Sequence, residues 1–165
     1  MTIRVNKSTQ LLNKSTQFFT LTSKPTMKTK PCLTREDCQK MAAACAAEAL
    51  ASQWAVSIAI VDDGGHLMWY ERLDNAPPTS AEIGPAKARM AALGRRETKV
   101  YEEMINGGRF SFLSAGSATA LRGAMMEGGV PIMVDGQCVG AIGVSGVKSA
   151  EDAQIAQAGI KALLG

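Results

Sequence analysis

The sequence predicts an α+β domain in which an antiparallel sheet of about five strands is flanked by helices. Two stretches around residues 63–65 (DGG) and 135–136 (DG) combine alternating apolar residues with the turn residues of β-hairpins. Helical spacing of apolar residues precedes, separates and follows these two stretches. Hairpin strands are antiparallel neighbours, so this order favours α+β over a parallel α/β fold.

The first helix is predicted from Thr34 to about Gln53. Residues 34–37 (TRED) have the arrangement of a capping box, and Cys38, Met41 and Cys45 recur at helical spacing.

The first hairpin follows this helix. Alternation over 56–60 indicates a half-buried strand, and the return strand covers 66–73. Alternation along the return strand predicts that Leu67 and Trp69 share one face. The other face is expected to carry His66, Met68, Tyr70 and Arg72.

The Pro-containing segment 76–79 ends the hairpin, and helices are predicted over 80–94 and 97–106. Residues 109–113 (RFSFL) fit either a strand or a loop. The second hairpin spans 130–144, and a final helix begins with the capping sequence 149–152 (SAED) and runs to Leu164.

Charge divides the 165 residues into two parts. Residues 1–33 hold six of the 18 basic residues and no acidic one, so residues 34–165 carry 12 basic and all 15 acidic residues. A folded part with this balance is not expected to bind nucleic acid, and no apolar run reaches the ~20 residues of a membrane span. Residues 1–30 are expected to be a disordered extension, or the product of an upstream start codon with Met27 as the true start. The domain is assigned to 31–165.

The four cysteines show no CxxC spacing, and the chain has one histidine. A metal site built by the protein is therefore not expected, and a reducing cytoplasmic compartment is the default.

Basic and aromatic residues near the first hairpin suggest a pocket. Lys87 falls on the inward face of the helix over 80–94, where it either extends to the edge or meets an anion. Arg72 and Tyr70 share a strand face that suits a carboxylate and a ring, or is simply solvated. Glu127 is a candidate general acid or base, and Ser145 a candidate anion ligand or turn residue.

Five segments together resemble the GlcG/HbpS family of small haem-binding-protein-like domains. They are residues 61–67 (VDDGGHL), 72–76 (RLDNA), 87–89 (KAR), 128–132 (GGVPI) and 140–146 (GAIGVSG). The resemblance covers nearly all of the ordered chain. It implies a profilin-like fold with a five-stranded antiparallel sheet, and homo-oligomers built from dimers.

Residues 87–97 (KARMAALGRRE) and 99–101 (KVY) are similar to a subgroup tied to nitroaromatic breakdown, the hydroxylaminobenzoate lyases and mutases. This likeness implies conversion of a small aromatic acid without a cofactor, with ammonia released (lyase) or retained as an amine (mutase). In that reaction Arg72, Arg89 or Lys87 would hold the carboxylate. Tyr70 or Trp69 would stack on the ring, and Glu127 or Tyr101 would donate the proton.

The alternative implied by the same family is a protein that binds or senses haem or another tetrapyrrole. Haem iron takes His, Cys, Met or Tyr as its ligand. The candidates near the first turn are His66, Met68 and Tyr70. Cationic side chains would suit a haem propionate as well as a benzoate, so charge alone does not separate the two hypotheses.

Overall fold

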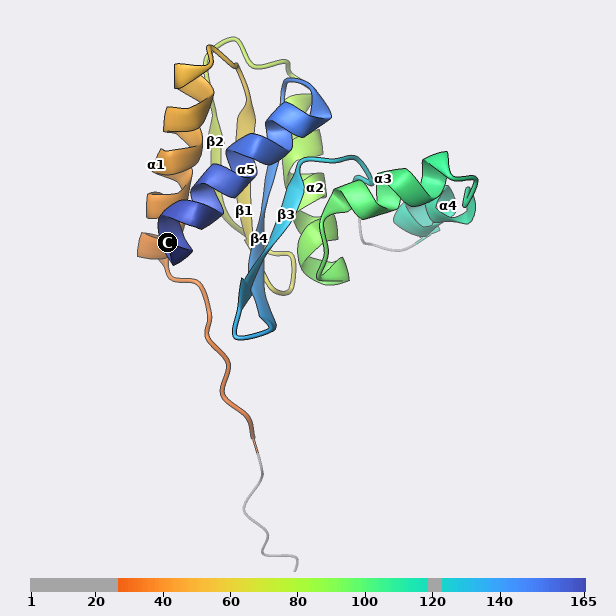
Figure 1. The fold of residues 1–165 in the computed structure, drawn as a ribbon, viewed down its shortest axis with the longest axis horizontal. Coiled ribbons are helices and arrows are strands. Elements are labelled where there is room, and N and C mark those ends of the chain that lie inside the picture. The colour runs from red at the N-terminus through yellow and green to blue at the C-terminus, as the bar shows by residue number, and fades with distance from the viewer. Residues whose placement is uncertain (1–26, 119–122) are drawn as a thin grey trace, which may run out of the picture.

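A computed structural model describes residues 27–118 and 123–165 (Figure 1). The helices are α1 (Arg35–Ala51), α2 (Ser80–Gly94), α3 (Thr98–Asn106), α4 (Ser111–Ala118) and α5 (Ser149–Leu164). The strands are β1 (Ser57–Asp62), β2 (Leu67–Arg72), β3 (Gly129–Val134) and β4 (Gln137–Ser145). The extension was predicted over residues 1–30, of which 1–26 lie outside the described residues, and 27–34 form neither helix nor strand.

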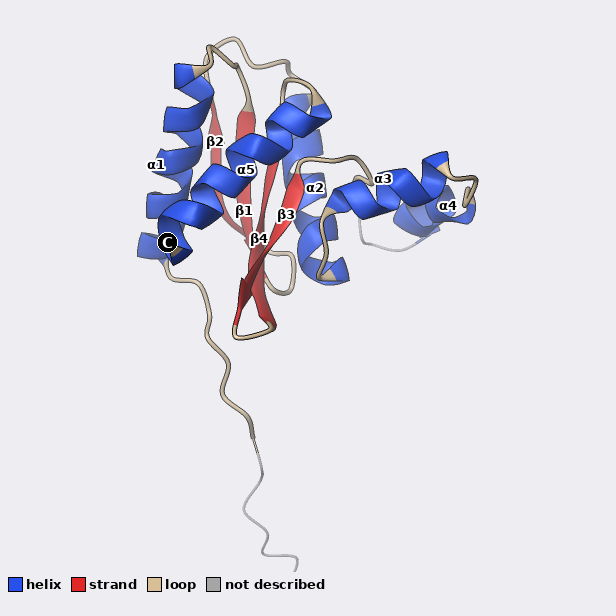
Figure 2. Ribbon diagram, in the orientation of Figure 1, coloured by secondary structure: helices blue, strands red, loops and turns tan. Residues whose placement is uncertain are grey.

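The described strands form one antiparallel sheet in the order β2-β1-β4-β3 (Figure 2). The predicted α+β class is confirmed, but the described residues contain four strands and not about five. Residues 109–113 were expected to form a strand or a loop, and this prediction is wrong from Ser111 on, where helix α4 begins. The two predicted hairpins are β1–β2 and β3–β4, and β1 pairs with β4 to join them.

Helices cover both faces of the sheet (Figure 1). On one face α1 and α5 enclose the larger core, to which β1 contributes Ile58 and Ile60. On the other face α2 packs on a smaller, alanine-rich cluster that includes Ala59 and Val61 of β1. Strand alternation thus sends large side chains to one layer and small ones to the other.

Small residues on β4 allow α2 to lie very close to the sheet. A Cβ atom on Gly143 would collide with the carbonyl oxygen of Gly84 and the backbone of Ala88, both in α2. We expect Gly143→Ala to lower the free energy of unfolding by about 1–3 kcal/mol, the usual cost of overpacking a core. Urea denaturation measures this, and an unchanged midpoint would show that the interface can open without cost.

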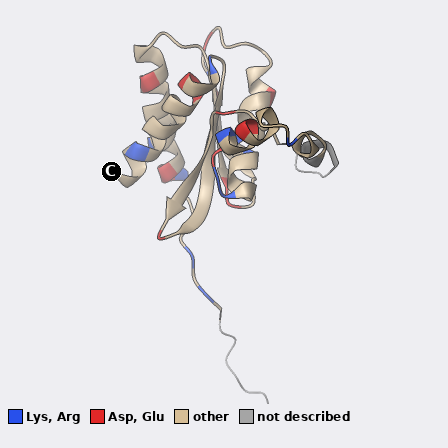
Figure 3. Ribbon diagram, turned by 45° about the vertical axis from the view of Figure 1, so that its right-hand side comes forward, with Lys and Arg blue, Asp and Glu red and all other residues tan. Residues whose placement is uncertain are grey.

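Charges of both signs occur on α1, α2, α3 and α5 (Figure 3). The basic residues therefore do not gather on one helix in residues 27–118 and 123–165, and the expectation that the folded part does not bind nucleic acid stays a prediction.

Candidate functional site

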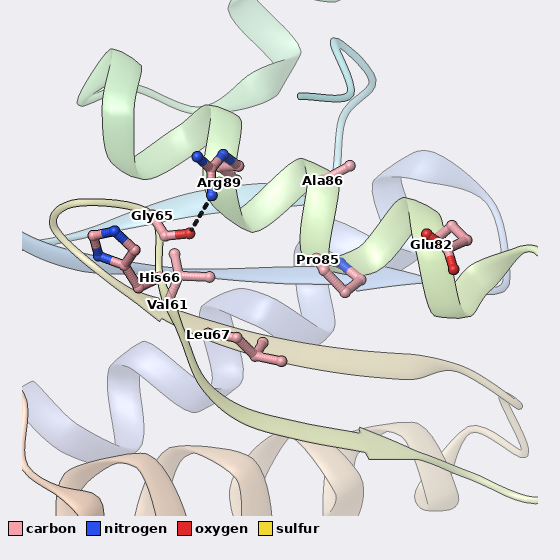
Figure 4. A pocket seen from close by; sticks show the side chains of 8 residues that line it. All are labelled: Val61, Gly65, His66, Leu67, Glu82, Pro85, Ala86 and Arg89. Atoms are coloured by element: carbon pink, nitrogen blue, oxygen red, sulfur yellow. Dashed lines mark hydrogen bonds between the residues drawn. The ribbon is translucent and has the colours of Figure 1, made fainter. Parts of the chain in front are cut away.

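A cleft of about 340 Å³ lies between α2 and the β1–β2 hairpin (Figure 4). It exists because α2 packs mainly on β4, β1 and β3 and leaves β2 largely uncovered on that face. Its walls are Val61, Gly65, His66 and Leu67 from the hairpin and Glu82, Pro85, Ala86 and Arg89 from α2. The volume falls at the lower end of the ~300–1,000 Å³ typical of small-molecule sites.

The Asp62 carboxylate organises the turn at one end of this cleft. Its Oδ1 accepts hydrogen bonds from the backbone amides of Gly64 (2.9 Å) and His66 (2.8 Å). Burial acts to raise the pKa of the Asp62 carboxyl. The carboxyl also accepts hydrogen bonds from the backbone and ring of His66 and from the Gly64 amide. These bonds outweigh the effect of burial, so the pKa of Asp62 lies below its usual value. Asp62 is therefore an anion at neutral pH.

The imidazole of His66 faces this carboxylate with one nitrogen. Its Nδ1 lies 3.1 Å from Oδ2 and 3.2 Å from Oδ1 of Asp62, and 76% of the side chain is exposed. An anionic neighbour favours the tautomer that carries its hydrogen on Nδ1. The lone pair of Nε2 is then left for an external group, the arrangement seen in metal-ligating histidines.

Arg89 places a cation on the opposite wall of the cleft (Figure 4). One terminal nitrogen of its guanidinium donates to the Gly65 carbonyl oxygen over 3.0 Å. Its Nε is buried and has no hydrogen-bond partner among the described residues. Gly65 has a φ of +77°, and a Cβ there would lie 2.9 Å from Cγ of Arg89, so this close approach needs glycine.

The cleft is also charged at its far end. Glu82 precedes Arg89 by seven residues, which corresponds to about 10 Å along a helix. Between these charges the helical wall is formed by Pro85 and Ala86, with Leu67 facing them from the hairpin. The site therefore offers an apolar centre, an imidazole and a guanidinium at one end, and a carboxylate at the other.

Of the residues singled out from the sequence, His66 and Arg89 line the cleft. Tyr70 lies on the same side of the sheet, where its hydroxyl lies 3.2 Å from Oγ of buried Ser57. Arg72 donates to the Ala76 carbonyl oxygen over 2.7 Å and so closes the loop after β2.

Trp69 and Leu67 do not share a face, so that prediction is wrong. The β1–β2 pairing shifts between Ile60 and Val61, and this bulge sets Leu67 opposite Val61. Leu67 lines the cleft, while Trp69 packs against the larger core on the other side of the sheet. The irregularity of one residue moves Leu67 to the face that carries Tyr70 and leaves Trp69 on the other, because side-chain direction alternates along a strand.

Lys87 is inward, as predicted, and it meets an anion of the protein. Its Nζ lies 2.7 Å from Oδ2 of Asp152 in α5, and the two side chains are 1% and 2% exposed. Burial raises the pKa of the Asp152 carboxyl more than Lys87 and the Val147 amide lower it. The pair joins α2 to α5 and does not line the cleft.

The other candidates occupy different places. Glu127 pairs with Lys99 over 3.1 Å, and its backbone amide donates to Glu102. Tyr101 is 6% exposed and packs edge-on against Phe112. Ser145 is buried opposite Ser57 in the sheet. The cleft therefore contains none of these three residues and excludes Trp69 and Lys87 as well.

Sequence reasoning did not single out Asp62 or Glu82. A signal for Asp62 was present, because an aspartate four residues before a histidine, across a Gly-Gly turn, can reach the ring. For Glu82 the sequence held no signal beyond its place near the start of a helix.

Cys38, Cys45 and Cys138 are buried, whereas Cys32 is exposed and lies outside the cleft. Burial raises the pKa of the Cys45 thiol to about 12 and also raises that of Cys38. Within residues 27–118 and 123–165 no group of three or more His, Cys, Asp and Glu residues could hold a metal ion. In the same ranges no helix has the length and apolarity to cross a membrane.

Comparison with known sequences identifies close relatives. The family model described as haem degrading protein HbpS-like matches residues 33–161. Protein GlcG of Escherichia coli strain K12 is 52% identical over 119 residues, which are 72% of this chain and 85% of that protein.

Comparison with solved structures finds the same fold. The Klebsiella pneumoniae protein ORFY matches with a TM-score of 0.78 at 27% identity, covering 86% of this chain and 97% of that one. The haem complex of PduOC matches with a TM-score of 0.75 at 26% identity, covering 81% and 96%.

Proposed function

This chain belongs to the HbpS-like family, and we propose that it binds haem in the cleft between α2 and the β1–β2 hairpin. The observation that carries the proposal is the paired imidazole of His66, whose Nε2 is left for a metal at the edge of an apolar cleft. A relative of the same fold, PduOC, was solved as a haem complex, which supports the choice of ligand.

The chemistry of the cleft fits such a group. His66 would hold the iron through Nε2, and Leu67, Pro85 and Ala86 would contact the apolar macrocycle. Arg89 would pair with a propionate through guanidinium N–H groups other than the one bonded to Gly65. Bound haem would supply a redox-active iron. A cleft of about 340 Å³ is small and open, so we expect the macrocycle to be held along one part and exposed along the rest.

The hydroxylaminobenzoate hypothesis has weaker support. Neither the family model nor the relatives name a lyase or mutase. Its proposed proton donors, Glu127 and Tyr101, lie outside the cleft that contains Arg89. Haem binding, the alternative drawn from the sequence, is therefore the function we put forward.

Titration of the purified full chain with hemin tests the proposal. A saturable red shift of the Soret band at one hemin per chain is the expected result. A featureless, non-saturating change would overturn it. A parallel incubation with 4-hydroxylaminobenzoate, followed by ammonia and ring-hydroxylated product, tests the enzyme hypothesis on the same preparation.

Arg89 should confer selectivity for haem that carries free propionates. Charged hydrogen bonds of about 1.5–3 kcal/mol correspond to a preference of roughly 10- to 100-fold for hemin over its dimethyl ester. Arg89→Gln should abolish the preference, and Arg89→Lys, which keeps the charge, should retain part of it. Equal preference in the wild type and Arg89→Gln would exclude Arg89 as the propionate ligand.

A further inference from the structure

The distinctive feature of the candidate haem ligand is the anion behind it. Both carboxylate oxygens of Asp62 lie within 3.2 Å of Nδ1 of His66. The carboxylate is fixed in this position, because Oδ1 also accepts the backbone amides of Gly64 and His66. The turn thus holds the negative charge of Asp62 in a fixed position beside the His66 imidazole.

A carboxylate that accepts the Nδ1 hydrogen increases the electron density of the whole imidazole. A more basic imidazole is a stronger donor at Nε2, and such outer partners typically alter metal affinity by about 10- to 100-fold. The gain is larger for the more highly charged iron, since Fe(III) is the stronger Lewis acid. A neutral group that accepted the same hydrogen bond from Nδ1 would increase the affinity for Fe(III) over Fe(II) by less.

We propose that Asp62, acting through His66, makes the cleft bind ferric haem more tightly than ferrous haem. This inference rests on the proposed function and adds the oxidation state of the ligand. Asp62 is a positioning residue, because it touches the imidazole and not the iron. The chain would accordingly take up oxidised haem and release it more readily once an external reductant has supplied one electron.

Other charges near the turn are separable from Asp62. Arg89 and Glu82 line the cleft with opposite charges, and Asp63 makes an ion pair with Lys30. In the described part of the chain, Asp62 is the charged residue that contacts the His66 ring. Asp63 therefore offers a matched control with the same charge, one residue away and bonded elsewhere.

The test compares dissociation constants for hemin and for dithionite-reduced haem under anaerobic conditions. The wild type should bind the ferric form at least tenfold more tightly, and each tenfold lowers the midpoint potential of the bound haem by 59 mV relative to free haem. Asp62→Asn keeps an oxygen for the two backbone amides but loses the charge. It should bring the ratio towards one and raise the potential, whereas Asp63→Asn should leave both unchanged.

Resonance Raman spectroscopy of the ferrous form gives a second readout. The iron–histidine stretch should fall in frequency in Asp62→Asn and stay the same in Asp63→Asn, which a purely structural role would not produce. A wild-type ratio of one or below would overturn the inference while leaving haem binding intact. Absence of any binding would overturn the proposed function, and the inference with it. If Asp62→Asn does not fold, a wild-type ratio of one or below still overturns the inference.

Discussion

Replacing His66 by alanine is expected to weaken hemin binding by about 100-fold or more, which corresponds to roughly 2.8 kcal/mol. His66 is the one histidine of the chain, so no other imidazole can replace it. The Soret band of any residual complex should resemble that of hemin without a nitrogen ligand. Spectrophotometric titration of wild type and variant measures both effects.

Two controls sharpen this experiment. Met68 is a neighbouring, half-exposed side chain with a sulfur that iron can accept, and Met68→Ala should leave the affinity within about twofold. Free imidazole added to the His66→Ala variant should restore the wild-type spectrum by occupying the vacated position. If Met68→Ala lost hemin binding and His66→Ala kept it, the iron ligand would be Met68 and our account would be wrong.

Replacing Lys87 by methionine is expected to lower the free energy of unfolding by about 3–5 kcal/mol. Methionine matches the length of the lysine stem but leaves the Asp152 carboxylate buried without its cation. The Val147 amide, at 3.2 Å from Oδ1, would be its remaining partner. Urea denaturation gives the difference, and Lys87→Met/Asp152→Leu should recover most of the loss because no charge stays buried.

Lys99→Met is the matched control, since the Lys99–Glu127 pair is 48% and 18% exposed. Water screens such an exposed pair, so its loss should change the stability far less than loss of the buried one. Equal destabilisation by both substitutions would mean that burial of the Lys87–Asp152 pair is not the source of the effect.

The loss in Lys87→Met should depend on pH. Removing the cation raises the pKa of Asp152 further above the value of about 3.9 expected in the unfolded chain. Between these two pKa values the folded state binds more protons than the unfolded state does. The contribution of Asp152 to stability is therefore greatest below its pKa in the unfolded chain, and it declines as the pH rises through its pKa in the folded state. The variant should therefore lose less stability at about pH 5 than at about pH 8. A deficit independent of pH would contradict this explanation.

Much of the fold was predictable because its signals are local. The capping box at residues 34–37 is present, with Thr34 and Asp37 bonded as expected. The final helix spans Ser149–Leu164, and both hairpins form where turn residues interrupt alternation. Residues 109–113 were not predictable, because their pattern suggested a strand or a loop, whereas helix α4 begins at Ser111.

The site was less predictable because it depends on long-range and irregular features. The inward direction of Lys87 follows from helical spacing, but its partner Asp152 lies 65 residues away. The bulge beside Val61, which sends Leu67 into the cleft, leaves no mark in the alternation of residues. The spacing of Asp62 and His66 allows their contact, but the three-dimensional turn is needed to place this pair beside Arg89.

The central claim, that His66 binds haem iron, is tested most directly by pulsed electron paramagnetic resonance. The protein is labelled with ¹⁵N in histidine alone and loaded with hemin of natural isotopic abundance. We expect a strong ¹⁵N hyperfine coupling to the ferric iron, which identifies His66 because the chain has one histidine. A spectrum that contains only the ¹⁴N couplings of the porphyrin would contradict the account.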